Sequence, residues 1–418
     1  MKIGIAKETT PFEKRVSATP ETVQKLIQMG CQVFVETDAG KESHFSDESF
    51  KKAGASILKT AKALYEKADV IFKVQKPHTA EWKIIPTGKT IIALYNILAD
   101  KSALHAAAQH KATACALELV PRITRAQSMD VLSSQSNLAG YKAVLEATHV
   151  FKRALPLMMT AAGTVKPAKV LIIGAGVAGL QAIATAKRLG AVVSAFDVRP
   201  VAKEQVESLG AKFVEVEQKA DAETAGGYAK EMDAEYKKKQ AALMHETLKE
   251  TDIVVTTALI PGKPAPRLIT KAMVQDMKTG SVIVDLAAEM GGNCELTEPG
   301  KVLTKEGVTI IGHTNMASLL SGNASELFAR NLLNYFMLLY DKEKKSLHFN
   351  FDDDIITATV ITHAGVLKRT DLTEKKVAVT TKAVKKPAAT KQKAPAKKTS
   401  AAKKPGTVKK AASKKTEK

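Results

Sequence analysis

Residues 169–179 read KVLIIGAGVAG, and this stretch decides the fold of the chain. It opens with a short, largely apolar run typical of a buried strand, and the glycines that follow have the spacing GxGxxG. Gly174 and Gly176 allow a tight turn and a close approach of the backbone to a pyrophosphate, while Gly179 lets the next helix pack closely on the strand. The N-terminus of that helix, at Val177, offers unpaired N–H groups to phosphates. The stretch therefore predicts a dinucleotide-binding strand, turn and helix.

The acid that closes the next strand indicates which dinucleotide is bound. Asp197 stands 18 residues after Gly179, at the end of the apolar stretch 192–196. A carboxylate at this strand end can accept hydrogen bonds from both ribose hydroxyls of NAD, and it would repel the 2′-phosphate of NADP. Arg199 is a complication, because its guanidinium could receive that phosphate. We interpret the site as selective for NAD, with helix capping as the alternative role of Asp197.

Short strands and helices alternate on both sides of this motif. The first helix has Thr19 as its N-cap, Pro20 at its first position and Gly30 as its stop. In the first third, the expected strands are 2–5, 32–36, 68–74 and 90–94, and the expected helices are 20–29 and 47–53. Later strands are expected at 169–173, 192–196, 212–216, 253–256, 281–285 and 309–311, and helices at 177–189, 201–209 and 231–249. This alternation predicts two Rossmann-like, doubly wound α/β domains with parallel sheets.

Two longer segments are expected to join the domains. Residues 133–159 lack strand character and predict one long helix, interrupted near Pro156. A second long helix, over about 324–340, would carry the chain back to the first domain. The expected domains are a discontinuous N-terminal α/β domain from residues 1–130 and 325–372, and a Rossmann domain from residues 140–315.

The positive charge of the chain is concentrated near its end. Of the formal net charge of +20, residues 375–418 contribute +15, from 16 lysines and one acid, Glu417. This Lys-, Ala- and Pro-rich segment cannot bury enough apolar surface to offset the entropy of ordering it, so we expect a disordered tail. Three roles stay open: binding anionic lipid head groups, binding nucleic acid nonspecifically, or a solvated extension without a partner.

Composition argues against several classes of protein. Hydrophobic residues make up 45% of the chain, and no uncharged apolar stretch reaches the roughly 18 residues that a membrane span needs. The first residues, MKIGIAKE, read as a strand and not as a secretory signal. The three cysteines are far apart, so we expect reduced thiols in a cytoplasmic compartment and no metal site.

Several long strings then resemble one family closely. They are PRITRAQSMD at 121–130, LSSQSNLAGY at 132–141, MTAAGT at 159–164, AGGYAKEM at 225–232 and TALIPGKPAP at 257–266. Together they resemble the NAD(H)-binding component of proton-translocating transhydrogenases, over about residues 1–370. Strings of this length are far more specific than GxGxxG alone.

The resemblance implies roles for individual residues. The positions that match the loop over the nicotinamide ring are Arg122, Gln127, Asp130 and Ser133. Those that match other nucleotide contacts are Val177, Asp197, Val198, Arg199, Gly227, Tyr228, Gln240 and Leu259, with Tyr228 in a loop that closes over the nucleotide. The alternative for Arg122 and Asp130 is a surface ion pair of little energetic weight.

Alanine dehydrogenase is a related family and the main rival. Its proton-transferring Lys and His correspond to Gln75, in KVQKP at 73–77, and to Asn96, in LYNILA at 94–99. Neither amide can exchange a proton near neutral pH, so the acid–base step that interconverts an amine and a ketone has no agent here. Arg15, which matches a carboxylate-binding arginine of the relative, is interpreted as structural.

Transhydrogenation does not require the Lys and His that are replaced here, because hydride transfer between two nicotinamides needs no proton transfer at the reacting carbons. Geometry and the exclusion of water are sufficient. The resemblance implies a Re/Si-specific enzyme, active only with its partner subunits, which carry NADP(H) and the membrane spans. It also implies a homodimer attached peripherally to the cytoplasmic face of the inner membrane through those partners. A non-enzymatic NAD-binding protein is the third hypothesis.

Overall fold

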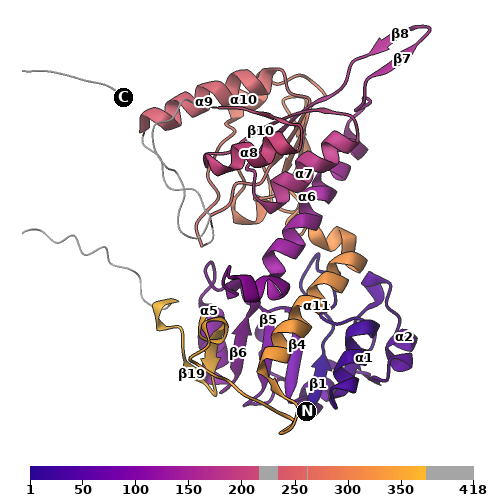
Figure 1. Cartoon of the computed structure of the whole chain (residues 1–418), viewed down its shortest axis with the longest axis vertical. Helices are drawn as coiled ribbons and strands as arrows, with labels where there is room; N and C mark the ends of the chain where they lie inside the picture. The colour runs from indigo at the N-terminus through magenta and orange to yellow at the C-terminus, as the bar shows by residue number, and fades with distance from the viewer. Residues whose placement is uncertain (216–233, 261, 373–418) are drawn as a thin grey trace, which may run out of the picture. The chain divides into compact units, whose positions relative to one another are not determined.

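The computed structural model describes residues 1–215, 234–260 and 262–372, which contain two large sheets and two small two-stranded ones (Figure 1). The predicted tail, residues 375–418, lies outside the described residues. The first sheet contains the strand order 3-2-1-4-5-6 of a doubly wound dinucleotide-binding fold, and the second begins with the same 3-2-1-4-5 and then adds β15 before the edge strand β14. The predicted α/β, Rossmann-like fold class is therefore confirmed for the described residues.

The first sheet has the order β19-β18-β6-β5-β4-β1-β2-β3 among the described residues. Its parallel strands are β1 (Lys2–Ile5), β2 (Gln32–Glu36), β3 (Ser56–Leu58), β4 (Val70–Gln75), β5 (Thr90–Leu94) and β6 (Thr113–Ala116). Its helices are α1 (Pro20–Gln28), α2 (Asp47–Lys52), α3 (Ala61–Lys67), α4 (Thr79–Trp82) and α5 (Ser102–Gln109). Helix α1 has the predicted ends: Thr19 caps it, Pro20 opens it, and Gly30 follows with a φ of 84°.

The second sheet has the order β11-β10-β9-β12-β13-β15-β14 within the described residues. Its strands are β9 (Lys169–Ile173), β10 (Val192–Phe196), β11 (Lys212–Phe213), β12 (Ile253–Thr256), β13 (Val282–Asp285), β14 (Val302–Lys305) and β15 (Val308–Ile311). Its helices are α7 (Val177–Arg188), α8 (Val201–Ser208), α9 (Ala234–Lys249) and α10 (Lys271–Gln275). Short 3₁₀ turns complete the described chain: η1 (Lys41–Ser43), η2 (Leu117–Leu119), η3 (Thr124–Met129), η4 (Ala288–Met290), η5 (Ala317–Leu320) and η6 (Thr370–Leu372).

The expectation of purely parallel sheets is wrong at three edge strands. Strand β14 runs antiparallel to β15; in the first sheet β18 (Val360–His363) runs antiparallel to β6, and β19 (Val366–Leu367) pairs antiparallel with β18. A tight turn, with Ala364 and Gly365 at positive φ, joins β18 to β19. Sequence alternation predicted neither this hairpin nor β6, because the TACA of β6 has little of the β-branched or aromatic content that marks a strand.

The long helix expected over 133–159 is also wrong in its last third, residues 151–159. Helix α6 (Val131–Val150) ends where Phe151 becomes extended, and an antiparallel hairpin of β7 (Met158–Thr160) and β8 (Gly163–Val165) follows. The Thr160 hydroxyl accepts from Ala162 N–H at 3.2 Å and donates to the Gly163 carbonyl at 3.1 Å, while Gly163 has a φ of 132°. This turn chemistry outweighs the helix propensity of the alanines. Both strands are exposed along their length, and the hairpin extends beyond α6 and α7 (Figure 1).

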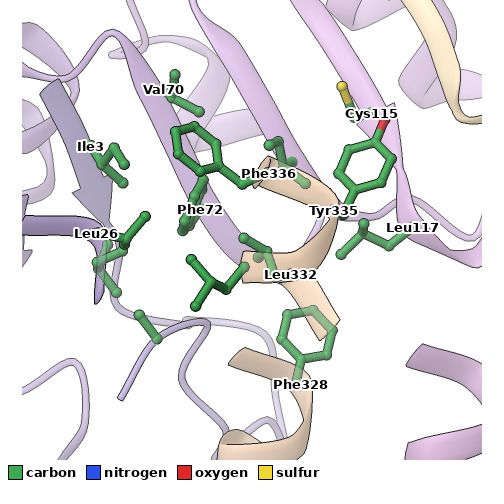
Figure 2. Packing of buried hydrophobic residues seen from close by; sticks show 14 of the residues in the cluster. Ile3, Leu26, Val70, Phe72, Cys115, Leu117, Phe328, Leu332, Tyr335 and Phe336 are labelled. Carbon is green, nitrogen blue, oxygen red and sulfur yellow. The ribbon is translucent and has the colours of Figure 1, made fainter. Parts of the chain in front are cut away.

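Helix α11 (Ser321–Leu339) follows the second sheet in sequence but belongs to the core of the first. Figure 2 shows its Phe336 beside Val70 and Phe72 of β4, and Leu332 and Phe328 follow along the helix in the same core cluster. Phe336 meets Phe72 edge-on with 5.4 Å between ring centroids, and the Tyr335 hydroxyl lies 2.7 Å from Thr359 of α12 (Asp354–Thr359). A small ladder, β16 (Tyr340–Asp341) with β17 (Ser346–Leu347), leads away from α11. Among the described residues, no helix is long and apolar enough to cross a bilayer.

Helices α6 and α7 pack so closely that a glycine is required between them. A Cβ placed on Gly140 of α6 would lie 2.0 Å from the carbonyl oxygen of Ala178, at the start of α7. Since this neighbour is backbone, no side-chain rotation can relieve the clash. Gly140 therefore fixes the distance between the two helices.

We predict that Gly140→Ala destabilises the protein by about 1–3 kcal/mol, because overpacking outweighs the roughly 1 kcal/mol that alanine gains in helix propensity. Gly322→Ala in α11 is the matched control, since its Cβ would meet nothing closer than 3.8 Å and should leave stability equal or slightly higher. Urea unfolding of both variants measures this. Equal midpoints for the two would refute the required close contact.

Candidate functional site

The glycine turn lies where the strand order reverses, between β9 and β12. Gly174 follows β9 with a φ of 97°, and its carbonyl accepts a 2.9 Å hydrogen bond from the Thr257 hydroxyl, just after β12. A Cβ on Gly179 would lie 1.8 Å from the Gly174 carbonyl oxygen, so only glycine fits there. The space around Gly176, by contrast, is open, and this residue caps α7 without a side-chain hydrogen bond. The turn thus leaves room and backbone donors for an anionic group.

Asp197 is the centre of a charged hydrogen-bond group beside this turn. Its side chain is 6% exposed and accepts from Ala175 N–H at 2.7 Å. The Arg199 guanidinium forks onto both carboxylate oxygens, with Nε at 2.9 Å and an Nη at 2.8 Å. Helix α8 is preceded by Pro200 and has no side-chain cap, so the capping alternative for Asp197 is wrong. Val198, half-buried, packs against the neighbouring core cluster.

The second group of predicted residues lies around the start of α6. Asp130 caps α6: its carboxylate accepts from the Ser133 N–H at 2.9 Å and from the Ser133 hydroxyl at 2.6 Å. Arg122 and Gln127 are exposed, the latter within η3. Because Gly140 of the same helix touches Ala178 beside the glycine turn, α6 connects the two groups of predicted residues.

The remaining predicted residues are more scattered. Gln240 is half-buried in α9. Leu259 is exposed and lies just after β12. Three residues later, a Cβ placed on Gly262 would lie 3.1 Å from the Leu98 side chain. Gly227 and Tyr228 lie outside the described residues.

Glu13 is a buried site residue that sequence reasoning missed. Its carboxylate holds the Arg15 guanidinium with contacts of 2.7 and 2.8 Å, and the two side chains are 0% and 4% exposed. Gln75 and Asn315 each donate to the same carboxylate at 2.9 Å. The third side of the guanidinium donates to Gln135 of α6 at 2.8 Å.

This network holds Arg15, the residue that matches a carboxylate-binding arginine of alanine dehydrogenase. Burial alone would raise the pKa of Glu13, but the charge of Arg15 and the hydrogen bonds from Arg15 and Gln75 lower that pKa to about 2. Glu13 therefore stays ionised near neutral pH and keeps its ion pair with Arg15. Asn96 is exposed at a φ of 50° in a turn, a conformation that asparagine tolerates well. Neither amide side chain, Gln75 or Asn96, can act as a general acid or base near neutral pH.

We predict that the Glu13–Arg15 pair governs stability at low pH. Because the pKa of Glu13 is depressed in the folded state, its contribution is present above about pH 4.5 and is lost as the pH falls toward about 2. Glu13→Gln should remove about 3 kcal/mol at pH 7 and flatten this acid dependence.

Glu21→Gln is the control, because the pKa of Glu21 is also lowered to about 2, by hydrogen bonds from Lys25 and Arg330, but its side chain is 46% exposed. Solvent screening should limit its effect to less than about 1 kcal/mol. Thermal unfolding from pH 2 to 7 separates the two variants. Similar small losses for both would contradict the buried-pair account.

Comparison with known proteins agrees with this geometry. Residues 4–139 match the family model "Alanine dehydrogenase/PNT, N-terminal domain", and residues 143–370 match "Alanine dehydrogenase/PNT, C-terminal domain". A Rhodospirillum rubrum protein named as the first portion of NAD(P) transhydrogenase subunit alpha is 53% identical over 380 residues, covering 89% of this chain and 99% of the relative. The NAD(P) transhydrogenase subunit alpha of Cereibacter sphaeroides is 46% identical over 370 residues, covering 88% of this chain and 71% of that relative.

Two solved structures have the same fold over most of the chain. A transhydrogenase from Sinorhizobium meliloti matches with a TM-score of 0.80 and 50% identity, over 88% of this chain and 100% of that one. An L-alanine dehydrogenase matches with a TM-score of 0.75 and 26% identity, over 89% and 100%. The resemblance found in the sequence strings is confirmed, with alanine dehydrogenase as the more distant relative. The chain therefore belongs to the alanine dehydrogenase/PNT family and, within it, groups with the alpha subunits of NAD(P) transhydrogenase.

Proposed function

We propose that this chain is the NAD(H)-binding subunit of a proton-translocating NAD(P) transhydrogenase. It holds NADH for direct, Re/Si-specific hydride transfer to NADP⁺ on a partner subunit. The observation that carries the proposal is a dinucleotide-type glycine turn combined with a carboxylate-binding arginine that Glu13 already occupies. Such a site can hold a nucleotide but lacks the means for amino-acid oxidation.

The residues around the glycine turn fit NAD(H). The open space at Gly176 and the uncapped start of α7 suit the pyrophosphate. Asp197 suits the ribose hydroxyls, which would share its oxygens with Arg199. A 2′-phosphate would meet the Asp197 carboxylate at short range, which favours NAD(H) over NADP(H) in this subunit.

The reduced nicotinamide supplies the hydride when it is bound, and the chain's own residues supply geometry. Arg122, Gln127, Asp130 and Ser133 orient the carboxamide and ring and help exclude water. Because the reaction needs no general acid or base, the rate of hydride transfer depends on how well these four residues are positioned before the acceptor binds.

Partners complete the enzyme. NADP(H)-binding and membrane-spanning subunits supply the acceptor and the proton path, and they attach this subunit to the cytoplasmic face of the inner membrane. A homodimer is included in the proposal. Helix α11 is largely buried, so the β7–β8 hairpin, with Met159 81% exposed, is the better candidate for the dimer contact. The proposal also includes two domains, one formed by residues 1–130 with 325–372 and the other by residues 140–315. It further includes nonspecific contact of the basic tail, residues 375–418, with anionic lipid or nucleic acid.

The purified chain should bind NADH with a Kd in the micromolar to sub-millimolar range and give negligible turnover of pyruvate with ammonia. Addition of the NADP(H)-binding partner should start hydride transfer from NADH to an NADP⁺ analogue. Absorbance of the reduced analogue measures this. Turnover of pyruvate by the chain alone would favour an alanine dehydrogenase instead. Absence of hydride transfer after the partner is added would favour a non-enzymatic NAD-binding protein.

Asp197→Asn should weaken NADH binding about tenfold, because a charge-assisted acceptor for the ribose is lost, and should narrow the preference for NADH over NADPH. Asp276→Asn, at a half-exposed position paired with His245, is the control and should leave both affinities unchanged. Fluorescence titration with the two nucleotides tests the pair. Equal NADH affinity in both variants would remove Asp197 from the site.

A further inference from the structure

The 3₁₀ turn η3, which carries Gln127, is hydrogen-bonded to asparagine side chains of α11 that have no role in the proposed function so far. The carbonyl of Ser128 accepts from the Asn331 amide at 2.8 Å and from the Asn334 amide at 3.0 Å. The Asn331 side-chain carbonyl accepts from the Ser134 hydroxyl of α6 at 2.7 Å. Asn331 is 9% exposed, so this polar group is held in a nearly dry environment.

A second fastening joins the same turn to α12. The Arg125 guanidinium donates to both oxygens of Asp353, each at 2.8 Å. Asp353 also caps α12, accepting from Ile355 N–H at 2.8 Å and from Ile356 N–H at 3.3 Å. A bidentate pair with a capping carboxylate has a defined direction, unlike a single contact between two flexible side chains.

The two sets of contacts use different groups of the turn: the Arg125 side chain and the Ser128 backbone carbonyl. In a 3₁₀ helix the side chains of residues i and i+3 lie above one another, so Arg125 and Gln127 project from different faces of the turn. The exposed Gln127 side chain takes no part in either set of contacts. A 3₁₀ turn of six residues is weak by itself and depends on such contacts to keep one conformation.

We propose that Arg125, Asp353 and Asn331 are positioning residues for hydride transfer. Their contacts with η3 fix its conformation, so that Arg122 and Gln127 already have their ring-contacting positions when the nicotinamide binds. This inference rests on the proposed function. Since displacements near 1 Å can cost up to about 100-fold in rate, a loosened turn should slow transfer more than it weakens nucleotide binding.

The test compares Arg125→Gln with Arg330→Gln in the full chain. Arg330 lies on α11 and pairs with Glu21 at 2.8 Å, and its side chain is 48% exposed, close to the 47% of Arg125. Arg125→Gln should keep the Kd for NADH within about threefold and lower the single-turnover rate of transfer to NADP⁺ on the partner about tenfold. It should also reduce amide-exchange protection over residues 124–129. Arg330→Gln should change none of these.

Asp353→Asn adds a second arm, because asparagine still caps α12 but loses the ion pair. It should reproduce the Arg125→Gln phenotype, and the double variant should be no slower than either single variant. Unchanged transfer in Arg125→Gln, or equal losses in Arg330→Gln, would overturn the inference while leaving the proposed function intact. A wild-type chain that neither binds NADH nor supports transfer would overturn both.

Discussion

The contact between Gly140 and Ala178 is the constraint on which the candidate site depends. It brings two helix backbones within the distance that only a glycine permits. One helix carries Asp130 at its N-terminus, and the other begins at the glycine turn. The arrangement of the two groups of predicted residues is therefore set by backbone packing, which is stiffer than any side-chain contact.

The Glu13–Arg15 network satisfies a buried arginine from within the fold. The arginine is kept, but its charge is satisfied from within, by Glu13 on one side and Gln135 on the other. Removing Glu13 or Arg15 alone would leave the other as an uncompensated buried charge. Both charged side chains are buried, so the network is part of the protein interior.

The strand-turn-helix around Gly174 and the position of Asp197 could be predicted from the sequence, because spacing along a single strand and helix determines them. Glu13 could not, since nothing in KRV or its neighbours indicates that a carboxylate will be buried against Gln75 and Asn315 from distant segments. The β7–β8 hairpin was missed for the opposite reason: its alanines favour a helix locally, and only the turn at Gly163 decides otherwise. Antiparallel β18 depends on a tertiary pairing with β6 that leaves little trace in either segment.

Helix α6 also has a consequence for how sequences of this kind can change in length. Asp130 and Gly140 sit on one continuous helix, so the number of residues between them acts as a fixed spacer. Inserting or deleting one residue there would turn one end against the other by about 100° and shift it by about 1.5 Å. The capping carboxylate and the glycine could then not both face their partners. Substitutions at solvent-exposed positions between Asp130 and Gly140 can be tolerated, but the number of residues between these two positions cannot change.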